Sequence, residues 1–202
     1  MAIPFTADER ERIHALLLDA GEALFPAQGL KKTSLDELVA PAGVAKGSFY
    51  AFFDSKEALY AAVMLRRAPL VAERLRPALA RRADVAGVTA LLRDLTDVLT
   101  TDPFYRRLLT HPEELRAVAR RVAPADVERI GPQLIAPVLD YIERGQRDGL
   151  LVGDVEPATV LGVMRTVGLV VMNRELFGAD HAAVLDATIA ALARGLTDPE
   201  RS

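Results

Sequence analysis

Apolar residues recur three or four positions apart along almost the whole chain, and no stretch alternates apolar and polar residues as a half-buried strand would. The first such segment stops at Pro26 and Gly29, two residues that end or interrupt helices. Ala, Leu and Val dominate the apolar residues and only 5% of the chain is aromatic, a mixture that suits close-packed helices better than a sheet. The sequence therefore predicts an all-α fold.

Local signals mark where the helices begin and end. Ser34, followed by Glu37, has the spacing of a capping box, in which a hydroxyl and a carboxylate satisfy two backbone donors. Pro41 ends this helix early, and Gly43 can supply the positive φ of a tight turn. Ser55 is expected to cap the helix that follows it. The expected helices cover residues 6–28, 34–40, 45–53, 55–65, 69–81, 85–100, 103–109, 112–122, 125–147, 157–176 and 180–195.

Two of these helices, 34–40 and 45–53, are short and are joined by a tight turn. Their apolar residues Leu38, Val44 and Phe49 stand where both helices can pack on the first helix. This arrangement is typical of a helix-turn-helix, whose second helix enters the major groove of DNA. From spacing alone, a simple corner between two helices of a helical protein remains the alternative.

The run AGVAKGSFYAFFDSKEAL, from Ala42 to Leu59, closely resembles the signature of the TetR family of transcriptional regulators. The preceding residues from Arg12 to Leu35 match that signature in order and spacing, so the resemblance covers about residues 10–60. Val39 and Pro41 depart from it, because the family usually has a small residue and a helix-extending residue there. The resemblance implies a three-helix DNA-binding head over residues 1–65 and a larger helical effector-binding and dimerisation domain over residues 66–202.

The resemblance also assigns contacts with the DNA backbone to Thr33, Ser34, Tyr50 and Lys56. Hydroxyl groups, lysines and the amides at helix N-termini are common phosphate partners, which agrees with this assignment. The alternative for Thr33 and Ser34 is helix capping alone, and for Lys56 it is a solvated surface position.

The second helix of the motif is expected to face the bases through Ala45, Lys46, Gly47, Ser48 and Ala51. Only Lys46 and Ser48 offer hydrogen bonds, and Gly47 is small enough to let the backbone approach the duplex. We therefore expect modest direct readout of the bases, with a contribution from DNA shape.

The segment 157–173 is apolar nearly all round, so one face must pack on its own domain and another against something else. The resemblance implies that this helix and the next one pair with their twofold mates in a four-helix bundle. Such a dimer would read a roughly palindromic operator, with its recognition helices about one turn of DNA apart or somewhat more. The expected interface residues are Val160, Val163, Met164, Val167, Val171, Leu185, Ile189 and Leu192.

The resemblance further implies a small-molecule pocket in the larger domain, whose occupancy releases the operator. The candidate lining residues are polar groups in apolar surroundings: Tyr105, His111, Arg165 and Asn173. Arg165 could instead pair with an acid within the dimer, and His111, directly before Pro112, could be a turn residue.

Other classes of function find little support. The chain has no cysteine and its three histidines are scattered, so neither a metal site nor a cofactor is expected. No nucleophile or phosphate-loop motif appears, which argues against an enzyme. A DNA-binding architectural or assembly factor without an effector remains the rival hypothesis.

Net charge and hydropathy bear on the partners and the location of the protein. The formal net charge of −3 argues weakly against a protein that coats nucleic acid, although all four lysines fall within residues 31–56. Residues 158–172 form the most apolar stretch, but they contain Arg165 and fall short of the about 20 residues that span a bilayer. The first ten residues lack the layout of a secretory signal. We expect a cytoplasmic location and no membrane partner.

Overall fold

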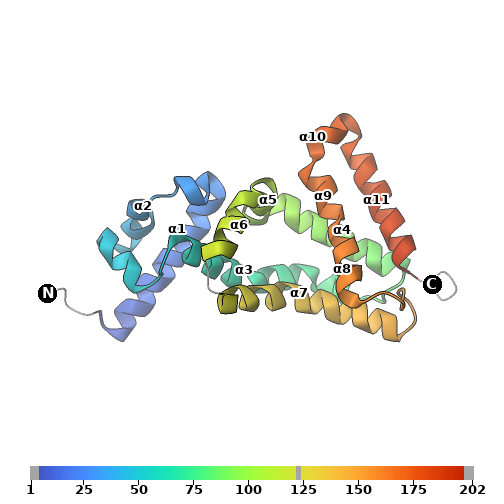
Figure 1. Ribbon diagram of the computed structural model, residues 1–202, viewed down its shortest axis with the longest axis horizontal. Coiled ribbons are helices and arrows are strands. Elements are labelled where there is room, and N and C mark those ends of the chain that lie inside the picture. Colours follow the sequence, from blue (N-terminus) through green and yellow to red (C-terminus); the bar gives the residue numbers. More distant parts are fainter. Residues whose placement is uncertain (1–4, 122–123, 198–202) are drawn as a thin grey trace. The chain divides into compact units, whose positions relative to one another are not determined.

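A computed structural model describes residues 5–121 and 124–197 (Figure 1). Within these ranges the chain is built from helices joined by short turns, and it contains no β-strand. The one β-type pairing among the described residues is an isolated antiparallel bridge between Leu151 and Thr197. The predicted all-α fold is confirmed.

The chain folds as two compact units. The head unit contains the chain up to Arg67 together with residues 111–130, and the body unit contains residues 68–110 and the chain from Gly131 onward. The first division thus falls after Arg67, whereas the sequence placed it after Leu65. Residues 111–130 group with the head, although no local signal in the sequence separates them from the body.

The first helix of the head, α1, runs from Ala7 to Lys32. It begins with a capping box in which the Thr6 hydroxyl accepts from the backbone N–H of Glu9 at 3.2 Å. A kink interrupts the helix at Gly29, whose φ of 85° lies in the region that favours glycine. The helix expected to stop at Gln28 therefore continues for four residues beyond it, across this kink.

The next two helices follow the local signals closely at first. Helix α2 spans Leu35–Val39, and a short 3-10 helix, η1, spans Ala40–Ala42 because Pro41 cannot donate to an α-helix. Gly43 takes the positive φ expected of it, 66°. The recognition segment, η2, spans Lys46–Ala51 and is a 3-10 helix rather than the expected α-helix.

The residues of η2 explain the difference from an α-helix. The position before it is Ala45, which has no side chain that could cap the first turn. Gly47 then lowers the helix propensity of a segment only six residues long. Tertiary packing of the aromatic residues at its end, and not local propensity, must therefore hold this segment in place.

Helix α3 runs without a break from Lys56 to Leu79, where two helices were expected. Its start agrees with the sequence, because the Ser55 hydroxyl accepts from the backbone N–H of Ala58 at 3.1 Å. It continues through Pro69, whose neighbours Ala68 and Val71 are buried. Packing of these neighbours offsets the loss of one backbone hydrogen bond.

The remaining helices are short or of medium length. They are α4 Val85–Thr101, α5 Pro103–Thr110, α6 Pro112–Arg121, α7 Pro124–Arg147, α8 Pro157–Arg165, α9 Val167–Met172, α10 Arg174–Phe177, the 3-10 helix η3 Gly178–Asp180, and α11 His181–Leu196. The single helix expected over 157–176 is divided at Thr166 and Asn173. Both side chains donate to backbone carbonyls of the preceding turn, at 2.7 Å, and so compete with the helical pattern.

The core of the body forms where α4, α7, α8, α9 and α11 meet, and Figure 1 shows α9 and α11 on the same side of α4. Fully buried residues include Leu91 and Leu92 of α4 and Tyr141 and Ile142 of α7. Four of the residues expected in the dimer interface lie in this core: Val160, Met164, Val167 and Ile189. Their own protomer covers them completely, which corrects the expectation that they contact a partner.

Gly87, in the first turn of α4, provides a test of this packing. Its N–H bonds to the Asp84 carboxylate at 2.9 Å, and an added Cβ would stand 1.9 Å from the carbonyl oxygen of Arg82. Gly87→Ala should therefore lower the free energy of unfolding by about 1–3 kcal/mol. Gly153→Ala, at an open position in a turn, should instead raise it by about 0.4–1 kcal/mol. Urea denaturation measures both, and equal stability of the two variants would contradict the close approach.

Candidate nucleic-acid interface

Aromatic packing fixes the orientation of η2 in the head. Phe49 is fully buried and lies 5.9 Å from the ring of Phe53, which stacks on His14 of α1 at 4.9 Å. Helix α2 contributes the fully buried Leu38 to the same unit. Because one side of η2 is committed to these contacts, its other side must face away from the head.

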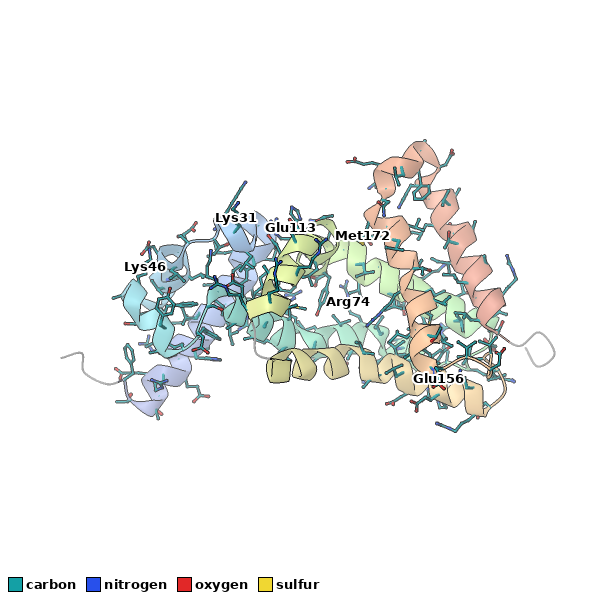
Figure 2. All side chains as sticks on the ribbon, in the orientation of Figure 1. Lys31, Lys46, Arg74, Glu113, Glu156 and Met172 are labelled. Atoms are coloured by element: carbon teal, nitrogen blue, oxygen red, sulfur yellow. The ribbon has the colours of Figure 1, made fainter. Side chains whose placement is uncertain are left out.

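The residues expected to read DNA lie on that outer side. Tyr50 is 59% exposed, and the ring of Phe49 meets it edge-on at 5.6 Å. An added Cβ on Gly47 would meet nothing within 4 Å, so the backbone is open to approach there. Figure 2 labels Lys46, which is exposed at the start of η2. Ala45 and Ala51 are exposed as well, and Ser48 is half-buried.

Lys46 is tied loosely to the preceding helix. Its ammonium donates to the Asp36 carboxylate of α2 at 2.9 Å, and both side chains are exposed. Exposed ion pairs of this kind contribute little free energy because water screens both charges. The ammonium can therefore exchange this carboxylate for another anion or for a base edge at small cost.

Thr33 and Ser34 use their hydroxyl groups inside the protein. Thr33 is fully buried and donates to the carbonyl of Gly29 at 2.7 Å, so its side chain has no surface for a phosphate contact. Ser34 accepts from the backbone N–H of Glu37 at 3.2 Å and donates to the Glu37 carboxylate at 2.7 Å. Helix capping, the alternative left open by the sequence, accounts for both hydroxyls.

The carboxylate of Glu37 is held in its charged form. Its hydrogen bond from the Gln28 amide, followed by those from the backbone and hydroxyl of Ser34, lowers the pKa of Glu37 from 4.5 to about 2. The backbone N–H and the hydroxyl of Ser34 thus already bond to an internal anion. A DNA phosphate would have to displace this carboxylate to bind the same donors.

Lys56 closes the end of α1 and does not stand free in solvent. Its ammonium donates to the carbonyl of Thr33 at 2.6 Å and to that of Leu30 at 2.9 Å, and the side chain is half-buried. The last carbonyls of a helix lack partners within the helix and carry partial negative charge, which favours a cation there. This geometry corrects the expectation that Lys56 is mainly a phosphate contact.

Glu114 of α6 bonds to the same end of α1, through a backbone N–H group instead of a carbonyl. Its carboxylate accepts from the N–H of Leu30 at 3.1 Å, and the residue is only 6% exposed. Eighty-four positions separate these two residues. The sequence carries no signal for this contact, because Glu114 and its neighbour Glu113 read simply as a charged first turn of a helix.

Arg10 is a second residue that sequence reasoning missed. Its guanidinium donates to the carbonyl of Ala51 at 3.0 Å and lies 5.2 Å from the centre of the Phe52 ring. It therefore closes the C-terminal end of η2 from the side of α1. The two residues are 41 positions apart, so only the folded head brings them together.

The four candidate effector residues differ in their surroundings. Tyr105 is buried in the body core, Arg165 is exposed on α8, and His111 belongs to the head unit. Asn173 lines a cavity of about 510 Å³ in the body. Helical spacing alone could not decide which of these polar side chains points inward. The cavity is lined by Leu99, Thr100, Arg106, Thr110, Val171, Met172, Asn173, Arg174, Glu175, Leu176 and His181.

Within residues 5–121 and 124–197, no group of three or more histidines and acids is placed to hold a metal ion. This finding concerns the described part of the chain alone.

Residues 17–63 match the family model described as bacterial regulatory proteins, tetR family. The match covers most of α1, all of α2 and η2, and the first third of α3. No curated protein matches the chain with significance.

Many solved structures share the fold over nearly the whole chain. A TetR-family transcriptional regulator from Pectobacterium atrosepticum is 24% identical, with a TM-score of 0.67 over 96% of this chain and 98% of that one. RolR in complex with resorcinol is 17% identical, with a TM-score of 0.64 over 95% and 90% of the two chains. FadR from Bacillus subtilis in complex with stearoyl-CoA is 16% identical, with a TM-score of 0.62 over 91% and 99%.

Replacing Lys56 tests its role in the head. Lys56→Met leaves two carbonyls without their charged donor and should lower the free energy of unfolding by about 1–3 kcal/mol. Urea denaturation and amide hydrogen exchange at the end of α1 measure this loss. Lys31→Met, which removes an exposed lysine from the same turn, should leave stability within about 0.5 kcal/mol. If Lys56→Met is as stable as the unchanged protein, Lys56 does not stabilise the end of α1 and acts as a solvated surface lysine.

Proposed function

Since the chain belongs to the TetR family of transcriptional regulators and carries its helix-turn-helix domain, we propose that it binds a double-stranded DNA operator as a homodimer. In this proposal the head unit contacts DNA, the body unit dimerises, and a small molecule bound to the body releases the operator. We propose repression in the cytoplasm as its mode of action, since this is the commoner mode in the family. The observation that carries the proposal is the outer side of η2, which is accessible while Phe49 anchors the inner side.

The outer side of η2, together with Ala45 before it, suits a major groove. The ammonium of Lys46 and the hydroxyl of Ser48 can reach base edges, and the methyl groups of Ala45 and Ala51 can contact thymine methyl groups. Gly47 permits a close approach of the backbone. The hydroxyl of Tyr50 is suited to a phosphate contact.

The side chains of Thr33 and Lys56 bond to backbone carbonyls of the protein itself. Other residues must therefore supply the contacts with DNA phosphates. Lys31 and Lys32 are exposed in the last turn of α1 and are available for this purpose. We propose these two lysines as the residues that position the head on the DNA backbone.

Selection of bound duplexes from a random pool tests the proposal directly. A dimer should enrich a palindromic sequence whose half-sites lie about one helical turn apart or somewhat more. Enrichment of no sequence would overturn the proposed function, and enrichment of an unpaired half-site would overturn the dimer.

Substitutions on the selected operator separate base contacts from phosphate contacts. Lys46→Ala and Tyr50→Ala should each weaken binding, Lys46→Ala by about 1–3 kcal/mol with relaxed sequence preference. Lys31→Ala should weaken binding to all sequences alike and reduce the dependence of affinity on salt by about one counterion. Fluorescence anisotropy at several salt concentrations measures these effects.

Arg81→Ala removes the same charge from an exposed position in the body and is the matched control. Arg81→Ala should bind the selected operator with the same affinity as the unchanged protein. If Lys46→Ala and Tyr50→Ala also bind as tightly as this control, η2 does not face the DNA.

The exposed side of the last helices supports the proposed dimer. Residues 174–196 contain an 18-residue window with a mean hydropathy of 1.3, of which only 11% is buried. Leu169 and Leu176 of the preceding helices are 56% and 79% exposed. The length and composition of this window would also suit a membrane span. A second copy of the chain is the occupant we propose, because Asp186 and Arg194 interrupt the exposed side of α11.

The half-buried members of the expected interface remain part of this proposal. Val163, Val171, Leu185 and Leu192 keep some surface, and small residues between them allow close approach of a partner helix. The exposed residues of α11 that would contact the partner are Ala183, Ala187 and Ala191.

A charge on this surface should dissociate the dimer. Leu169→Glu places a carboxylate in the proposed interface and should convert the protein to monomers, as measured by sedimentation velocity. Leu70→Glu is the matched control, because Leu70 of α3 is 55% exposed but lies outside the interface. Leu70→Glu should stay dimeric. If Leu169→Glu also stays dimeric, the dimer interface lies elsewhere.

Ligand complexes among the structural neighbours support an effector. RolR was solved with resorcinol and FadR with stearoyl-CoA, two very different small molecules. The alternative is a DNA-binding architectural factor without an effector. A saturable thermal shift with a metabolite that also weakens operator binding favours the sensor, and the absence of both across a broad panel favours the architectural factor.

A further inference from the structure

The cavity of the body opens where the helix that was expected to run through residue 176 is divided. Asn173 breaks it between α9 and α10, with its side-chain amide bonded to the carbonyl of Leu169 at 2.7 Å. The cavity is bounded by the end of α4, by α5, by α9 and α10, and by the first residue of α11. Its volume of about 510 Å³ lies within the range of small-molecule sites.

One part of the lining is apolar. Leu99 comes from α4, Val171 and Met172 from α9, and Leu176 from α10. Figure 2 labels Met172 at the end of α9. Leu176 is 79% exposed, so most of its apolar surface stays in water, which is unfavourable in free energy. An apolar group placed in the cavity would bury these side chains.

The other part of the lining carries two guanidinium groups. Arg106 of α5 and Arg174 of α10 are both exposed, and neither guanidinium group has a hydrogen bond or an ion pair with any residue in the described ranges. Other arginines of the same unit do have such partners: Arg93 pairs with Asp186, and Arg144 donates to the carbonyl of Leu79. Two cations from different helices, without a partner in the described part of the chain, therefore line one cavity.

The remaining titratable groups limit the charge of the occupant. Glu175 is the one acid among the described lining residues. The Nε2 atom of His181 lies 3.3 Å from the carbonyl of Val170, which can only accept, so this nitrogen carries a proton. Two arginines and one glutamate give the lining a formal net charge of +1, counted with histidine neutral as in the formal charge of the whole chain. This balance favours a ligand with one negative charge over a dianion.

From this combination we infer that the cavity binds a small organic monoacid, a carboxylate joined to an apolar body. The planar carboxylate matches the forked donors of Arg106 and Arg174, and the apolar body covers Leu99, Met172 and Leu176. The inference rests on the proposed function, because it names the chemical class of the effector that the body unit binds.

Isothermal titration calorimetry with the full chain tests the inference without DNA. The probes are octanoate and benzoate, each compared with its neutral counterpart, octan-1-ol or benzyl alcohol. At least one acid should bind saturably, with one site per protomer, and at least tenfold more tightly than its alcohol. Equal affinity for acid and alcohol, or no binding of either acid, would overturn the inference. Tighter binding of octyl phosphate, a dianion, than of octanoate would overturn the monoacid assignment.

Variants locate the binding site. The double substitution Arg106→Met and Arg174→Met should weaken acid binding at least tenfold, while circular dichroism and melting temperature stay unchanged, because both side chains are exposed. Arg165→Met removes an exposed arginine of α8 that does not line the cavity, and it should bind the acid as the unchanged protein does. Equal binding by the double variant and this control would place the acid elsewhere.

The outcome is independent of the operator experiments. Loss of acid binding with an intact, selected operator would contradict the inference alone. Failure to select any operator would contradict the proposed function, whatever the calorimetry shows. A bound acid that also weakens operator binding, with the double variant insensitive to it, would support both.

Discussion

The end of α1 is the constraint on which the head depends. The kink at Gly29 interrupts the helix, and three side chains bond to backbone groups of its last turn. The Glu114 carboxylate takes the N–H of Leu30, the Thr33 hydroxyl takes the carbonyl of Gly29, and the Lys56 ammonium takes carbonyls of Leu30 and Thr33. The carboxylate therefore bonds to an N–H donor and the ammonium to carbonyl acceptors, an arrangement that stabilises both charges. The direction in which the chain leaves α1 and enters α2 is set here.

This constraint explains why several polar residues of the motif turn inward. A short α2 that ends at Val39, before Pro41, and a 3-10 helix of six residues have little stability of their own. The head must then be held by contacts at its ends: the capping box at Ser34, the ammonium of Lys56 and the guanidinium of Arg10 over η2. The outer residues of η2 are left free to bind because these inner groups fix the backbone behind them.

In the body, neighbouring residues of the same short helices lie partly in the core and partly on the surface. Residues of α8 and α9 alternate between the core, as with Met164, and the exposed side, as with Leu169. Asn173 also marks the cavity, where the exposed Leu176 lies beside two arginines whose guanidinium groups have no partner among the described residues. Uncovered apolar surface of this kind is costly in a lone protomer, and both the proposed partner chain and the proposed acid would cover part of it.

The sequence by itself determined the helical fold, the capping box at Ser34, the early end of α2 at Pro41, the positive φ of Gly43 and the family of the head. These features depend on residues within about four positions of one another, so local pattern is enough to find them. Only the tertiary structure decided the side on which each polar residue acts. Lys56 and Thr33 bond inward, Glu114 joins the head across 84 positions, and Val160 and Met164 fill the core of the body. Such contacts depend on how helices rotate and pack against distant segments, and helical spacing does not encode that rotation.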